Sequence, residues 1–134
     1  MDADALLRRI DLEGEFSDQA HAERATGAVL SVLGERLSGG EPGDLAAQLP
    51  PEIAEALPDR GAGEVFGVEE FDRRVAEREG GRCSLPEAHR HAVAVMQVVL
   101  SAVSVGERRE VAAQLPAEYW DLLPADAISR SGAQ

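Results

Sequence analysis

Lysine and asparagine are absent from this sequence, and cysteine, tryptophan and tyrosine each occur once among its 134 residues. The single cysteine, Cys83, excludes an intrachain disulfide, so the fold must rest on an apolar core. The N-terminus carries no basic segment followed by an apolar one. We therefore expect a cytoplasmic protein.

Cationic side chains are also scarce. Thirteen arginines face 25 aspartates and glutamates, which gives a formal net charge of -12. Nucleic-acid binding requires clustered cations that neutralise phosphates, and the arginines here occur at most in pairs set among acidic residues. The same negative field repels anionic lipid headgroups. We expect neither a nucleic acid nor a membrane as partner.

No hydrophobic run is long enough to span a bilayer. The most apolar stretch, Ala92 to Val105, falls short of the roughly 18 residues that a membrane helix needs. It is also interrupted by Gln97, Ser101 and Ser104. We interpret it as a buried helix of a soluble protein.

The chain contains an internal repeat. Residues 22–58 align without gaps with residues 88–124, and 16 of the 37 pairs are identical. The longest match pairs residues 46–52 (Ala-Ala-Gln-Leu-Pro-Pro-Glu) with residues 112–118 (Ala-Ala-Gln-Leu-Pro-Ala-Glu), and a Ser-x-Gly-Glu motif at 38–41 recurs at 104–107. Residues 6–10 match residues 71–75 at a shift one residue smaller, so one residue was gained between these blocks. The pattern indicates a tandem duplication.

In each copy, the sequence pattern predicts two longer helices followed by two short ones. The first helices cover about 3–13 and 68–79, and the second begin at Ser17 and at Ser84, where Ser84-x-x-Glu87 fits a capping box. Prolines end the short helices of both copies. No stretch alternates with period two long enough to indicate a strand. We predict an all-α fold of two pseudo-symmetric repeats packed as a compact helical bundle.

We predict one domain over residues 1–128, because either repeat alone is near the size at which a core becomes marginal. Repeat one covers about 3–58 and repeat two about 68–124, with a linker at 59–67 and a disordered tail at 129–134. Packing within one chain can replace a two-fold partner, so a monomer and a homodimer both remain open.

These motifs resemble a bacterial family known as domain of unknown function 2267. The resemblance rests on the doubled Ala-Ala-Gln-Leu-Pro-x-Glu block after Ser-x-Gly-Glu, and on the Arg-Arg pair of each first helix, over about Leu6 to Pro124. It implies the two-repeat helical fold and no particular reaction, cofactor or catalytic residue. One departure is visible, because Pro42-Gly43 stands in repeat one where repeat two has Arg108-Arg109.

The residues that occur in both copies can be explained by structural roles. They are Gln48, Pro50 and Glu52 in the first copy and Gln114, Pro116 and Glu118 in the second. The prolines break helices, the glutamines lie where helix carbonyls lack partners, and the glutamates face the positive end of the next helix. The alternative is a paired ligand or peptide site formed by the two glutamines.

Histidine and cysteine give no clear catalytic or metal motif. His89 and His91 are two residues apart and so lie on different helix faces, unlike the i, i+4 pair of a helical zinc site. Glu87 and His91 share a face, which a capping glutamate beside a solvated histidine explains. Cys83 stands next to Arg82 at a helix start, where a thiol pKa can fall, although an ordinary half-buried thiol is the simpler interpretation. We expect no metal, no cofactor and no catalytic residue.

Two functions follow as hypotheses. The first is a non-enzymatic protein-interaction module in which Tyr119 and Trp120 anchor another protein, although the same pair could instead fill the space between the repeats. The alternative is a small-molecule binder or enzyme with a pocket between the repeats, where the two second helices meet near His91, Met96 and Gln97.

Overall fold

The computed structural model describes residues 2–80 and 82–128, and it confirms the predicted all-α fold. The expected tail at 129–134 lies outside the described residues. The elements of the first half are α1 (Ala3–Gly14), α2 (Gln19–Arg36), β1 (Ser38–Gly39), α3 (Glu41–Ala46) and α4 (Pro51–Ala54). After β2 (Gly61–Ala62), the second half contains α5 (Val68–Glu79), α6 (Leu85–Ser101), α7 (Val105–Ala113) and two 3-10 helices, η1 (Ala117–Leu122) and η2 (Ala125–Ala127).

Side-chain caps mark the starts of α1, α2, α6 and α7. Ser84 forms the predicted capping box with Glu87 at the start of α6. At α2 the cap is Asp18 and not Ser17, because the Asp18 carboxylate accepts the His21 backbone N–H at 2.8 Å. The predicted helix through Ala92 to Val105 is also corrected, since α6 ends at Ser101 and Ser104 caps α7.

A short β pairing was not predicted. β1 and β2 are antiparallel, with Ser38 opposite Ala62 and Gly39 opposite Gly61, so the linker folds back on the first half. Two-residue strands are too short to show any alternation of side chains. Gly61 is required here, because a Cβ at this position would stand 1.9 Å from the Leu37 carbonyl oxygen.

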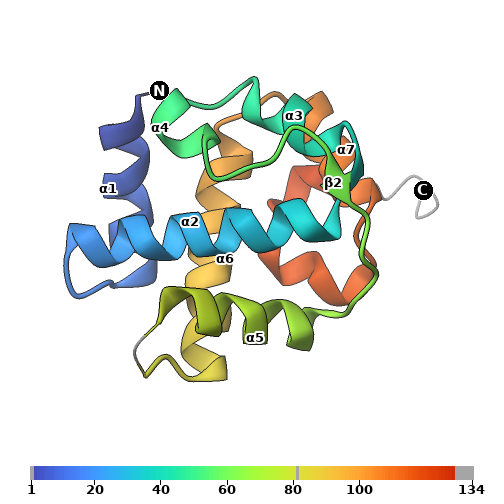
Figure 1. Cartoon of the computed structure of the whole chain (residues 1–134). Helices are drawn as coiled ribbons and strands as arrows, with labels where there is room; N and C mark the ends of the chain where they lie inside the picture. Colours follow the sequence, from blue (N-terminus) through green and yellow to red (C-terminus); the bar gives the residue numbers. More distant parts are fainter. Residues whose placement is uncertain (1, 81, 129–134) are drawn as a thin grey trace.

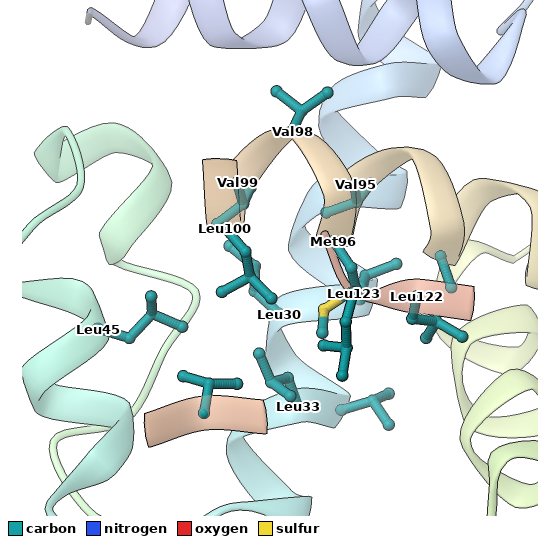
Figure 2. Packing of buried hydrophobic residues seen from close by; sticks show 14 of the residues in the cluster. Leu30, Leu33, Leu45, Val95, Met96, Val98, Val99, Leu100, Leu122 and Leu123 are labelled. Carbon is teal, nitrogen blue, oxygen red and sulfur yellow. The ribbon is translucent and has the colours of Figure 1, made fainter. Parts of the chain in front are cut away.

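The core is formed by both halves together. α2 packs against α1, α5 and α6, and α6 crosses behind α2 and α5 (Figure 1). Leucine and valine side chains of α2 and α6 meet those of α3 and the segment at Leu122 and Leu123 (Figure 2). Among the described residues, no helix combines the length and apolar character needed to cross a membrane.

The helices follow in the same order in both halves, but in the described part of the chain β1, β2 and η2 have no counterpart and several lengths differ. α3 has six residues and α7 has nine, which fits the Pro42-Gly43 departure, and the α4 helix of the first half is replaced by the 3-10 helix η1. The loop between α1 and α2 covers residues 15–18, whereas the loop between α5 and α6 covers 80–84 and is one residue longer. The extra residue in the alignment of the two halves therefore falls in that second loop.

Candidate functional site

A polar cavity of about 290 Å³ lies where the start of α2 meets the end of α5 and the start of α6. In Figure 1 this place is at the left of the molecule, where α2 begins and α5 ends. The longer loop at 80–84 contributes to its rim. The lining residues are Ser17, His21, Arg24, Glu79, Gly80, Arg82, Cys83, Glu87 and His91.

A buried carboxylate with two imidazole partners forms one wall of this cavity. The Glu79 side chain is 1% exposed, and its Oε1 lies 3.0 Å from His21 Nε2. Its Oε2 lies 2.7 Å from His91 Nδ1. An ionised carboxylate only accepts hydrogen bonds, so both ring nitrogens donate to it. Three separate elements, α2, α5 and α6, thus bring the three side chains together.

The electrostatics keep this carboxylate charged. Burial by itself raises the pKa of Glu79, but hydrogen bonds from His91 and His21 more than offset that effect and leave the pKa below its ordinary value. The Glu79 carboxylate is therefore ionised at neutral pH. An aromatic ring fixes the two imidazoles, because Phe16 stands 4.5 Å from His91 and 5.0 Å from His21 between ring centroids.

Cys83, on the rim of the cavity, is a poor nucleophile. Burial raises the pKa of its thiol to about 11, and the nearby carboxylates of Glu79 and Glu87 add to the effect. A thiol with such a pKa is protonated at neutral pH. The structure thus favours the ordinary half-buried thiol, because burial and the acidic neighbours outweigh the positive charge of Arg90.

The sequence did not single out this cluster. One nitrogen of each histidine and one oxygen of Glu79 lie within 4.8 Å of one another, although His21 and Glu79 are 58 residues apart in the chain. The third histidine, His89, points elsewhere and bonds to Asp72 at 2.8 Å and Asp121 at 2.5 Å. The sequence pointed to the site only through His91, which was predicted to line a pocket, and through the residue gained in the adjacent loop.

The structure separates the three residues proposed to line a pocket. His91 faces Glu79 and the cavity. Met96 is fully buried in the core, where Figure 2 shows it among leucine side chains. Gln97 donates its amide to the backbone carbonyls of Asp121 and Leu123, at 3.2 and 2.9 Å, and so fastens η1 to α6.

Tyr119 and Trp120 also have different surroundings. Tyr119 is fully buried, its ring packs edge-to-face on Phe71, and its hydroxyl donates to the Phe66 carbonyl at 2.6 Å. Trp120 is 41% exposed and lines a shallow cavity of about 210 Å³. Apolar residues beside it include Ala112, Leu115 and Ile128.

The repeated glutamines connect the two halves. Gln48 accepts the backbone N–H of Ser104 at 2.8 Å, and Gln114 accepts the backbone N–H of Ser38 at 2.8 Å. Each glutamine thus binds the half to which it does not belong, a reciprocal pattern that a local two-fold relation requires.

The other repeated residues lie around the short helices. Pro50 and Pro116 directly precede α4 and η1. Glu52 lines a shallow cavity beside Leu7 and Thr26. The Glu118 carboxylate lies close to Gly67, where a Cβ would stand only 2.8 Å from its Oε2.

Comparison with known proteins supports the resemblance seen in the sequence. A search of curated proteins gives no match. Among family models, residues 3–122 match the family described as "Uncharacterized conserved protein (DUF2267)", which covers nearly all of the chain. The chain therefore belongs to the DUF2267 family.

Proposed function

We propose that this chain is a non-enzymatic binding protein and that its ligand is a divalent transition-metal ion of the zinc type. The observation that carries the proposal is the convergence of two imidazoles and one buried, ionised carboxylate at a cavity. Neutral imidazole and carboxylate are the nitrogen and oxygen ligands that zinc prefers.

The distances suit such an ion after a small adjustment. Ligands about 2.0–2.2 Å from a tetrahedral zinc stand roughly 3.3–3.5 Å apart. The present separations, 3.0 Å from His21 to Oε1 of Glu79 and 2.7 Å from His91 to Oε2, would therefore open by about half an ångström when the N–H protons leave and both oxygens face the ion. Three protein ligands would leave a fourth position for water or a ligand that enters from the cavity.

The cluster occurs only once, unlike the residues that maintain the fold. The positions of the first half that correspond to Glu79 and His91 are Gly14 and Ala25, which cannot bind a metal. Residues with a purely structural task in a duplicated chain are expected in both copies, as Gln48 and Gln114 are. The asymmetry of the cluster supports a task of its own.

The test uses cobalt(II) as a spectroscopic substitute for zinc. After treatment with a chelator, the intact chain is titrated with cobalt(II), and we expect visible absorption bands of a low-symmetry site with one ion bound per chain. Zinc should remove these bands by competition. His91→Gln should abolish them, whereas the matched control His89→Gln, which changes a histidine outside the cavity, should leave them unchanged.

Two results would contradict the proposal. Bands of equal intensity in the His91→Gln variant, or the absence of bands in a wild-type chain that circular dichroism shows to be folded, would exclude this metal site.

A second candidate is the protein-interaction module, now restricted to Trp120. The specific observation is a partly exposed indole beside an apolar cavity on a chain of net charge -12. This charge favours a partner with an arginine-rich rim around an apolar anchor. Because Trp120 is the only tryptophan, its fluorescence reports on this face alone. A blue shift on titration with amphipathic arginine-containing peptides supports the candidate, and an unchanged spectrum argues against it.

A further inference from the structure

Two glutamates face each other where the halves meet. Glu41 begins α3 and Glu107 lies in the first turn of α7, and both belong to the repeated Ser-x-Gly-Glu motif. Figure 1 shows α3 and α7 together at the upper right, away from the His91 cavity. Glu41 and Glu107 are only 9% and 6% exposed. The Oε2 atom of each is buried and has no hydrogen-bond partner.

Burying two carboxylates side by side lowers the stability of the fold unless hydrogen-bond donors or a cation compensate for their lost hydration. A buried carboxylate oxygen without a donor loses its hydration and gains nothing in return. The following arginines do not supply the missing donors, since Arg108 and Arg109 bond to Asp126 and, for Arg108, to two backbone carbonyls. Burial and the adjacent Glu41 raise the pKa of Glu107 to about 8, which reflects the same lack of a counter-charge.

Two further carboxylates complete the cluster. Asp44 and Glu110 occupy equivalent positions one turn along α3 and α7, and both are exposed. One oxygen from each of the four side chains lies within 4.8 Å of the others. We define Glu41, Asp44, Glu107 and Glu110 as the carboxylate cluster.

We infer that the carboxylate cluster is a calcium site that joins the two halves of the chain. Calcium takes six to eight oxygen ligands at about 2.3–2.6 Å, so two ligands on opposite sides of the ion stand about 4.6–5.2 Å apart. The four oxygens lie within 4.8 Å of one another, so a single ion of this size can contact all of them. Magnesium usually keeps several of its waters and binds only one or two protein carboxylates, whereas calcium accepts a site formed mainly by carboxylates, so the four carboxylates favour calcium.

The all-oxygen donor set also separates this site from the one at His91. Carboxylates favour hard cations, whereas imidazoles favour zinc and related metals. The inference therefore does not depend on the proposed function. A bound calcium would give the unpartnered oxygens of Glu41 and Glu107 a ligand and would fix the contact between α3 and α7.

The experiment measures thermal unfolding of the full chain, after chelator treatment, with and without calcium near neutral pH. When free Ca²⁺ exceeds the dissociation constant about a hundredfold, we expect the midpoint to rise by about 5 °C or more. Glu107→Gln should abolish this rise. The matched control Glu77→Gln changes an exposed glutamate of α5 and should retain it. His91→Gln should also retain it, which separates this site from the zinc proposal.

Several results would overturn the inference. The first is the absence of any rise in the midpoint at about 10 mM Ca²⁺, a concentration above the dissociation constants of even the weak extracellular calcium sites. The second is a rise that persists in Glu107→Gln. An equal rise with Mg²⁺ at the same concentration would exclude the assignment to calcium. If calcium has no effect and Glu107→Gln alone raises the midpoint, the two glutamates share a proton and hold no cation.

Discussion

The His91 cavity and the carboxylate cluster bury charge in two different ways. Glu79 has a donor on each of its oxygens, and its pKa lies below the ordinary value. Glu41 and Glu107 are almost as deeply buried, yet each has an oxygen without a partner, and the pKa of Glu107 is raised to about 8. Burial alone therefore does not determine the state of a carboxylate in this fold, because the donors around it decide the sign of the shift.

The two places also differ in symmetry. The carboxylate cluster combines equivalent residues of both halves, whereas the His91 cavity combines residues that occur once. Where α3 meets α7, equivalent acidic residues of the two halves lie together, so like charges are adjacent. At the His91 cavity, beside the loop that is one residue longer, unlike groups lie together.

Removing Glu79 should have the largest effect. In the metal-free chain, Glu79→Ala leaves His21 and His91 without their acceptor and opens space in a buried position, so we expect a loss of about 3 kcal/mol in the free energy of unfolding. Urea unfolding followed by circular dichroism measures it. Glu77→Ala, at an exposed position, should cost less than about 0.5 kcal/mol. A loss equally small for Glu79→Ala would mean that the histidines find water as a substitute acceptor.

The corresponding change in the carboxylate cluster should act in the opposite direction. Because the folded pKa of Glu107 lies above its unfolded value, its contribution to stability is fully present below about pH 4.5 and is lost as the pH rises to about 8. Without divalent cations, Glu107→Gln should therefore stabilise the chain by about 1 kcal/mol near pH 8 and by less near pH 5. Urea unfolding at both pH values checks this, and destabilisation near pH 8 would contradict it.

The reciprocal glutamines provide a test of symmetry. Gln48→Ala and Gln114→Ala each remove the acceptor of one serine backbone N–H, so each should cost about 1 kcal/mol. Thermal unfolding of the two variants should give midpoints that agree within about 2 °C. If one substitution leaves the unfolding midpoint unchanged and the other lowers it, the two hydrogen bonds contribute unequally to stability and the two-fold description fails.

The smallest effect is expected at His89. Burial lowers the pKa of His89, but hydrogen bonds and charge from Asp121 and Asp72 outweigh this and raise it overall. Its contribution to stability is therefore fully present below the unfolded pKa of about 6.5 and is lost as the pH rises through the folded pKa. His89→Gln should cost about 0.5 kcal/mol near pH 6 and nothing near pH 9, because the pair is partly exposed. A cost that does not depend on pH would assign His89 a packing role only.

Most of the fold could be predicted from the sequence. Ser84 and the prolines mark helix ends through local chemistry that acts within a few residues, and the internal repeat predicted a corresponding pair of longer helices in each half. The errors lie where local signals compete or are too short. Asp18 replaces the adjacent Ser17 as a cap, and the two-residue strands contain glycines and no pattern.

The candidate sites were less predictable for a physical reason. His21 and Glu79 meet through the packing of α2 against α5, and no helical spacing encodes a contact between residues 58 positions apart. The carboxylate cluster had a visible signal in the repeated Glu41 and Glu107, but the sequence could not show that the two copies face each other. Tyr119 illustrates the same point, because only the structure shows that it is buried while its neighbour Trp120 is exposed.

The exchange between Ser38 and Gln114, and between Ser104 and Gln48, bears on the ancestry of the chain. Two copies of a half-length protein would make the same pair of contacts across an isologous dimer interface. After gene fusion of such a dimer, each copy of a loop could change in length and sequence independently of the other copy. In such a fusion product, the loop between α5 and α6, which is one residue longer and adjoins Glu79, would be the place where the halves diverged.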